Sequence, residues 1–133
     1  MITKLPNICI VSHDAGGAEL ISSYVKRKID NIYLYVLSGP AVKIFERKLG
    51  FLKVSELELA IKRSELIICG TSWESNIDMK AITLSKKYGK KVISFLDHWV
   101  NYQGRFFYKK KKIFPDEIWV MDEYAKTIAN QQL

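Results

Sequence analysis

The chain has 133 residues, which matches one domain and is too short for two. Apolar residues make up 48% and charged residues 26%, which excludes a disordered chain, and no apolar stretch approaches the roughly 20 residues of a membrane-spanning helix. The formal net charge is +7, and because no export signal precedes the first strand pattern, we expect a cytoplasmic protein.

The N-terminal half alternates short apolar runs with amphipathic stretches. A β-branched run predicts a buried strand at 7–11, and an apolar stripe that ends in basic residues predicts a helix at 17–28. A strand at 31–37, a helix at 41–48 that ends at Gly50, and a short edge strand at 51–54 follow. Ser55 and Glu58 have the spacing of a capping box, which predicts a helix at 56–63.

The C-terminal half continues the alternation. A buried strand is expected at 66–69, and Ser75 with Asp78 repeats the capping-box spacing, which predicts a helix that Gly89 ends. A strand at 91–96, a long loop over 97–115, a strand at 117–120 and a helix at 123–130 complete the chain.

Strict alternation of strands and helices predicts an α/β fold, a doubly wound, mainly parallel sheet of about six strands with helices on both faces. In this Rossmann-like arrangement the expected strand order is 3-2-1-4-5-6. The direction of winding then reverses between the first and fourth strands. We therefore expect a ligand crevice at the C-terminal ends of those two strands.

Polar and aromatic side chains follow the strands at that edge, and both histidines of the chain are among them, each beside an aspartate. The candidates are Ser12, His13, Asp14, Gly16 and Gly17 after the first strand, Thr71, Ser72, Trp73 and Glu74 after the fourth, and Asp97, His98 and Trp99 after the fifth. A histidine beside a carboxylate is typical of a general base, so the candidate catalytic residues are His13, Asp14, Asp97 and His98. Helix capping or hydrogen bonds between loops also explain both histidines. A shared metal ion is disfavoured because the side chains of adjacent residues diverge.

Gly16 and Gly17 precede a helix, where residues without a Cβ let a ligand approach backbone N–H groups. A tight turn without a ligand explains these glycines too. Because the sequence is not G-x-G-x-x-G and Asp14 would repel a pyrophosphate, we expect no nicotinamide or flavin cofactor. Trp73 and Trp99 offer flat faces on which sugar rings or bases stack, or they fill the core, whereas Trp119 inside the last strand is expected in the core.

Ten basic residues lie between positions 80 and 112 against one acid, Asp97, so this segment has a charge of +9 (10 − 1). Arg105 and the run Lys109, Lys110, Lys111 and Lys112 belong to it, next to three aromatic residues. Such a patch attracts phosphorylated ligands, nucleic acid or anionic lipid, and a solvated face that keeps the protein soluble also explains it. Contact with the inner face of a membrane through the lysine run stays open. Nucleic acid is disfavoured because no nucleic-acid motif accompanies the patch.

Cys9 and Cys69 stand inside apolar runs. This placement favours two buried, reduced thiols over a disulfide or a metal ligand.

Four segments with distinctive residues follow one another along the chain. A Gly-rich first loop (SHDAGGAEL), a strand that ends in Gly-Thr-Ser (LIICGTS), a strand that ends in an acid, a histidine and an aromatic residue (VISFLDHW) and a PDEIWV strand succeed one another. Together they resemble the N-terminal half of glycosyltransferases of the two-Rossmann-domain (GT-B) class and of UDP-N-acetylglucosamine 2-epimerases. The resemblance covers nearly the whole chain.

The resemblance implies that the Gly-rich loop and the cluster after the fifth strand face a cleft between two domains, with Gly16 and Gly17 as its floor and His13, Asp14, Asp97 and His98 as base and acceptor contacts. From the strand ends and the basic segment, ligand contacts are expected from Ser12, Gly16, Gly17, Thr71, Ser72, Trp73, Glu74, Trp99 and Arg105. The resemblance further implies the acceptor-side half of a sugar-nucleotide-dependent transferase for cell-surface polysaccharide. Since the sequence stops at Leu133, it is expected either to be the N-terminal part of a longer two-domain protein or to work with a separate chain that supplies the donor half, and the rim is expected to remain exposed or to self-associate. The alternative is a stand-alone Rossmann-like module that binds a phosphorylated or nucleotide ligand without catalysis.

Overall fold

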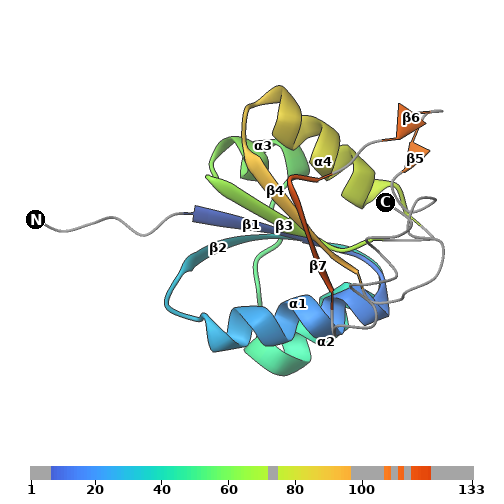
Figure 1. The fold of residues 1–133 in the computed structure, drawn as a ribbon. Coiled ribbons are helices and arrows are strands. Elements are labelled where there is room, and N and C mark those ends of the chain that lie inside the picture. Colours follow the sequence, from blue (N-terminus) through green and yellow to red (C-terminus); the bar gives the residue numbers. More distant parts are fainter. Residues whose placement is uncertain (1–6, 72–74, 97–106, 109–110, 113–114, 121–133) are drawn as a thin grey trace, which may run out of the picture.

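The computed structural model describes residues 7–71, 75–96, 107–108, 111–112 and 115–120 (Figure 1). Within these residues five parallel strands form one sheet. In spatial order they are β2 (Ile32–Leu37), β1 (Asn7–Ser12), β3 (Leu66–Cys69), β4 (Lys91–Leu96) and β7 (Glu117–Val120). This order confirms the predicted doubly wound α/β fold, with the winding reversed between β1 and β3.

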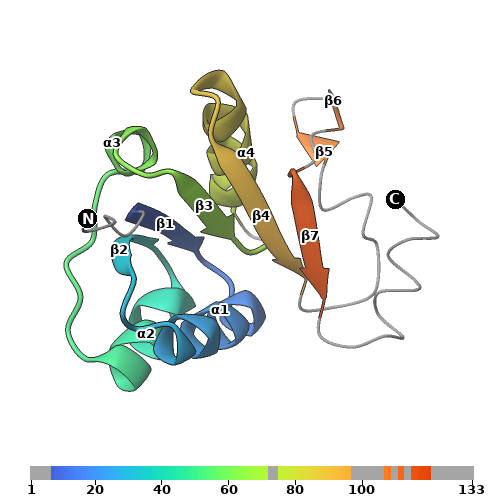
Figure 2. The ribbon, with the colours of Figure 1, turned by 60° about the vertical axis from the view of Figure 1, so that its left-hand side comes forward.

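Helices cover both faces of the sheet (Figures 1 and 2). One face carries α1 (Ala15–Arg27) and α2 (Pro40–Leu49), and the other carries α3 (Leu57–Lys62) and α4 (Ile77–Lys87). Side chains of a strand point alternately to the two faces, so Ile8 and Ile10 of β1 join the core under α1 and α2, whereas Cys9 and Val11 join the core under α3 and α4. The described part of the chain contains no helix with the length and apolar character needed to cross a bilayer.

The predicted edge strand at 51–54 is wrong as a strand. Only Val54 pairs with the sheet, through a single bridge to Tyr35, and the N–H of Ser55 donates to the Tyr35 carbonyl at 2.6 Å. Phe51 is 88% exposed, so this segment has too little buried side chain to hold a longer ladder at the edge of the sheet.

Two helix starts differ from the capping-box prediction. The carboxylate of Glu56, rather than the Ser55 hydroxyl, caps α3 and accepts the N–H groups of Glu58 and Leu59 at 3.0 and 2.9 Å. Glu56 has extended backbone, and its longer side chain folds back over the first turn. Before α4, the Ser75 hydroxyl accepts the Ile77 N–H at 3.1 Å, and Asn76 occupies the cap position.

The predicted loop over 97–115 contains a short antiparallel hairpin of β5 (Phe107–Tyr108) and β6 (Lys111–Lys112). The predicted helix at 123–130 lies outside the described residues. Trp119 is half-buried rather than fully enclosed, and its ring packs edge-on against Tyr24 of α1 and Phe95 of β4.

Cys9 and Cys69 are both unbridged and buried, which confirms the prediction of two thiols. Burial raises the pKa of the Cys9 thiol to about 12, and burial is also the main reason why the pKa of Cys69 lies well above its usual value.

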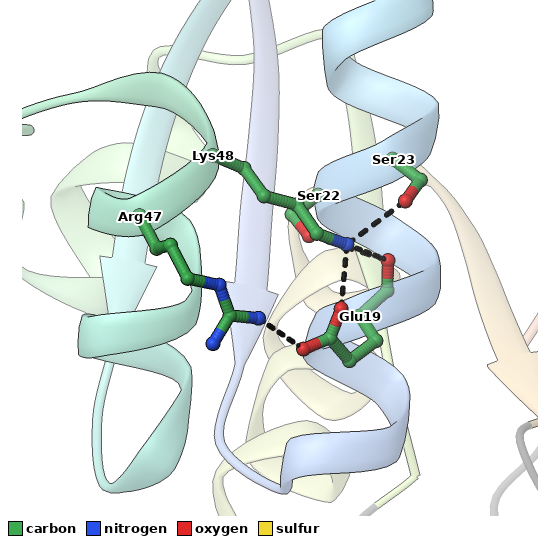
Figure 3. Close-up of polar contacts among 5 residues, drawn as sticks. All are labelled: Glu19, Ser22, Ser23, Arg47 and Lys48. Atoms are coloured by element: carbon green, nitrogen blue, oxygen red, sulfur yellow. Dashed lines mark hydrogen bonds and ion pairs between the residues drawn. The ribbon is translucent and has the colours of Figure 1, made fainter.

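An ion cluster joins α1 to α2 (Figure 3). The Arg47 guanidinium and the Lys48 ammonium both reach Glu19 on α1, at 2.5 and 2.7 Å, and Lys48 also donates to the Glu19 carbonyl and the Ser23 hydroxyl, each at 2.9 Å. The hydrogen bonds from Lys48 and Arg47 lower the pKa of the Glu19 carboxyl. The cluster joins the two helices at their solvent side, while their apolar residues share one core. Both helices begin at the edge of the sheet where the site is predicted.

Candidate functional site

The candidate site lies at the C-terminal ends of β1 and β3. The chain leaves β1 through α1 on one face of the sheet and leaves β3 through α4 on the other face. When two neighbouring parallel strands are followed by helices on opposite faces of the sheet, a crevice is expected between the first turns of the two helices. The structure brings to this edge six of the predicted residues: Ser12, His13, Asp14, Gly16, Gly17 and Thr71.

His13 and Asp14 form a directly bonded pair. The His13 Nδ1 and Asp14 Oδ1 atoms are 2.6 Å apart, and the two side chains are 17% and 19% exposed. Because a carboxylate oxygen can only accept a hydrogen bond, the hydrogen sits on Nδ1, and Nδ1–H donates the hydrogen bond to Asp14. In the neutral imidazole the other ring nitrogen, Nε2, has the lone pair and is the atom that can accept a proton from a ligand.

The edge of the His13 ring that carries Nε2 packs closely against Gly39. A Cβ at Gly39 would lie 2.6 Å from His13 Nε2, closer than any side chain tolerates, and the residue has a φ of +54° that favours glycine. The carbonyl of His13 also accepts the N–H of Ala41 in the first turn of α2 at 3.1 Å. The histidine backbone is therefore anchored to α2, and its ring occupies room that only a glycine leaves. The sequence analysis did not include Gly39 in the site. The Ser-Gly-Pro turn after the second strand marks a glycine at this position, but it does not indicate contact with His13.

The start of α1 combines close packing with polar groups. Gly17 is buried, and a Cβ on it would lie 3.6 Å from the Cα of Gly70, so the absence of side chains brings α1 close to the end of β3. Gly16 is half-buried in the same turn. Asp14 occupies the N-cap position, but its carboxylate bonds to His13 and does not cap α1.

Ser12 is a buried polar residue at this edge, as is Thr71. Ser12 is 1% exposed, and among the described residues its hydroxyl has no hydrogen-bond partner. Ser12 ends β1 on the same face as Ile8 and Ile10, which is the face that α1 covers, so its hydroxyl lies beneath the start of that helix. A hydroxyl buried without a partner costs about 1–3 kcal/mol, which a bound polar ligand would offset.

A second polar group under the start of α4 was not predicted as part of the site. Asp78 is only 2% exposed, and its charge, after burial, is a further reason why the pKa of Cys69 is raised. Cys69 and Ser94, on neighbouring strands, place Sγ and Oγ 3.2 Å apart. In the sequence, the spacing of Ser75 and Asp78 indicates helix capping. The apolar pattern of a helix does not show whether a carboxylate in its first turn is buried, so the sequence does not predict this placement.

Seven predicted site residues fall outside the described part of the chain: Ser72, Trp73, Glu74, Asp97, His98, Trp99 and Arg105. Within the described part, no group of three or more histidine, cysteine, aspartate or glutamate side chains is placed to hold a metal ion. A shallow hollow of about 540 Å³ lies at the opposite, N-terminal edge of the sheet, lined by Lys86, Gly89, Lys90, Lys91 and Asp116. It is therefore separate from the predicted crevice.

Comparison with known proteins identifies no relative. The chain matches no protein-family model, and neither the curated proteins nor the solved structures include a significant match. The chemistry of the site therefore has to be argued from the chain's own residues.

Proposed function

We propose that this chain is the acceptor-side half of a sugar-nucleotide-dependent glycosyltransferase-like protein, in which His13 is the general base. The observation that carries the proposal is the His13–Asp14 pair at the reversal point of the sheet, with the His13 ring seated against Gly39 and both side chains partly exposed. This arrangement fits a base that removes a proton from a hydroxyl group.

In the proposed reaction Nε2 of His13 takes the proton of an acceptor hydroxyl while the hydroxyl oxygen bonds to the anomeric carbon of the donor sugar. The bond from that carbon to the nucleoside diphosphate breaks, and the diphosphate leaves with the bonding electrons. Asp14 holds the ring in one tautomer and stabilises the positive charge that the ring acquires. A second domain or partner chain binds the sugar nucleotide in this scheme.

A specific observation favours a second candidate, a module that binds a phosphorylated ligand without turnover. The buried Ser12 hydroxyl lies beneath a helix start that the Asp14 side chain does not cap. Backbone N–H groups at a helix N-terminus and a hydroxyl are typical ligands of a phosphate group.

Titrations followed by amide and histidine-ring NMR separate the two candidates. Neutral saccharides, sugar phosphates, sugar nucleotides and inorganic phosphate are added to the intact chain and to His13→Gln. The acceptor-half proposal expects neutral saccharides to shift the His13 ring and the Gly39 amide, with binding weakened at least about tenfold in His13→Gln. Shifts caused only by phosphate-bearing compounds, with inorganic phosphate as a competitor, would favour the binding module.

Calorimetric titration with a panel of sugar nucleotides, with release of the nucleoside diphosphate measured alongside, tests the need for a second half. The proposal expects no turnover by this chain alone. Tight binding of a sugar nucleotide with turnover would show that the site is complete and that the half-enzyme assignment is wrong.

A further inference from the structure

The large apolar side chains that remain exposed gather on one side of the sheet. Among the described residues they are Ile29, Ile32, Phe51, Val54 and Leu59, with exposed fractions from 44% at Leu59 to 88% at Phe51. β2, which contains Ile32, is the edge strand of the sheet, and Figure 2 shows the segment that joins α2 to α3 passing along the outer side of β2. We call the surface formed by these five side chains the apolar edge.

The pairing with β2 brings these side chains onto one surface. Val54 bridges Tyr35 in parallel, so Phe51 and Ile32, each three residues earlier, lie toward the same end of the edge. The turn before β2 and the helix α3 that packs against β2 add the other two, Ile29 and Leu59. The single bridge at Val54 is too short a ladder to bury any of them within the chain.

The size of the apolar edge matches the apolar part of a dimer contact. At about 150–200 Å² for a fully exposed large side chain, the exposed fractions leave on the order of 500 Å² of apolar surface. An interface of standard size buries about 800 Å² on each partner, and in homodimers about 65% of this area, or roughly 520 Å², is apolar. A second copy of the same surface therefore supplies the area that a stable contact needs.

The charge around the apolar edge is balanced, although the chain as a whole has a net charge of +7. The segments 28–37 and 50–62 contain three lysines and three acids, which leaves 0 (3 − 3): Lys28, Lys53, Lys62, Asp30, Glu56 and Glu58. A surface without net charge does not attract nucleic acid or anionic lipid. It is also the kind of surface at which two copies of a cationic chain repel each other least.

The charged side chains beside the apolar edge fit a two-fold contact. Glu58 and Lys62 pair with each other at 3.5 Å, whereas Asp30 and Lys53 form no ion pair among the described residues. In a two-fold contact a residue that meets a second residue of the partner is met in turn by its equivalent. Each copy therefore offers one acid and one lysine to the other, so the surface is complementary to itself in charge as well as in apolar area.

We propose that two copies of this chain associate through their apolar edges in a two-fold dimer. Phe51 is the main anchor of the contact, because an aromatic ring that becomes buried in an interface contributes more than most residues. The candidate site lies at the C-terminal ends of β1 and β3, so each copy keeps its own site outside the contact. The proposal is independent of the function proposed for that site.

Sedimentation equilibrium of the intact chain tests the proposal. We expect a dimer at about 50 µM, because interfaces of standard size have dissociation constants in the micromolar range or below. Phe51→Ser removes the anchor from both copies and should weaken the dimer at least about 30-fold. Leu59→Ser changes a different element of the same surface and should weaken it at least about fivefold.

The control is Lys80→Ser, which places the same residue at an exposed position of α4, outside the apolar edge. It should change the dissociation constant less than about twofold. Phe51 and Leu59 are exposed in the single chain, so their replacement should leave each copy folded, and unfolding in urea verifies this for every variant.

Hydrogen exchange gives a second readout that locates the contact. The backbone amides of residues 51–54 should exchange more slowly in the dimer than in the dilute monomer, because the second copy covers them. The amides of α4 should exchange at the same rate in both samples, since that helix lies outside the apolar edge.

Three outcomes overturn the proposal. They are a chain that stays monomeric up to about 200 µM, a dimer that Phe51→Ser and Leu59→Ser leave unchanged, and an equal weakening by Lys80→Ser. His13→Gln should dimerise like the unmodified chain, because His13 lies at the candidate site. A dimer that His13→Gln abolishes and Phe51→Ser does not would place the contact at the candidate site and would also contradict the proposal.

Discussion

Gly39→Ala should be unusually destabilising because two separate costs add at this position. The backbone at Gly39 has φ +54° and ψ −140°, a region that only glycine enters readily, so a side chain there costs about 1–3 kcal/mol in strain. The new Cβ would also lie 2.6 Å from His13 Nε2 and about 3 Å from both neighbouring ring carbons, and crowding of that kind costs a further 1–3 kcal/mol or so. The free energy of unfolding should fall by roughly 2–6 kcal/mol.

Gly50→Ala is the matched control for the backbone term. Gly50 has φ +86° and ψ −170°, and nothing lies within 4 Å of the position of its Cβ. Urea unfolding should therefore show that Gly39→Ala costs about 1–3 kcal/mol more than Gly50→Ala. The double variant His13→Ala/Gly39→Ala should recover that difference, because the crowded ring is gone. Equal losses at the two glycines, or no recovery in the double variant, would refute the packing of His13 against Gly39.

Three further measurements test other parts of the structure. Ser12→Ala should leave the free energy of unfolding unchanged or raise it by up to about 1 kcal/mol, because the hydroxyl that it removes is buried without a partner among the described residues. Ser64→Ala is the control: it removes a 2.7 Å hydrogen bond to the Ala60 carbonyl and should lower the free energy of unfolding by about 1 kcal/mol. Glu19→Gln should lower the urea midpoint of unfolding at neutral pH, with Glu46→Gln as the control. Because the pKa of Glu19 is lowered in the folded state, its contribution to the free energy of unfolding is fully present above the usual pKa of 4.5 and is lost as the pH falls through the folded-state pKa. The difference in midpoint between Glu19→Gln and the unmodified chain should therefore become smaller in acid. Labelling of Cys9 and Cys69 by a thiol reagent should be slow in the native protein because both thiols are buried with raised pKa values, and rapid labelling of both would contradict their placement.

The sheet could be predicted from the sequence because its strands are short apolar runs between well-marked turns. The predicted bounds of β3, β4 and β7 match the structure, and β1 extends only one residue further, to Ser12. Burial on both faces gives such strands a strong signal, since helices cover the sheet from both sides. The strand order follows from the right-handed crossovers that connect parallel strands.

The segments that the sequence predicted poorly are held by few contacts. The segment at 51–54 was apolar enough to predict a strand, yet Val54 makes one bridge and Phe51 points into solvent. The helix cap at Glu56 was missed because the Ser55 hydroxyl matched the expected pattern equally well. At the ends of elements, one or two hydrogen bonds decide between alternatives that differ little in free energy.

The candidate site was predictable only in part, for a related reason. His13 and Asp14 are adjacent in the sequence, so their pairing needed no long-range information. Gly39 approaches the His13 ring from the next strand's turn, and Asp78 turns inward from a helix start, and neither placement follows from local spacing. Long-range packing decides these positions, and it is set only when the sheet is assembled.

The two edges of the sheet differ in charge because all four helices begin at one edge and end at the other. The helices begin at the C-terminal edge of the sheet, and neither α1 nor α2 has an acidic residue in its first turn; the acid nearest the positive end of the α1 dipole is the N-cap residue Asp14, which pairs with His13. At the opposite edge, Lys86 and Lys87 stand in the last turn of α4, where each stabilises its own helix by about 0.3–1 kcal/mol and needs no partner to explain it. Lys90 lies beyond the end of α4, so the dipole does not explain it.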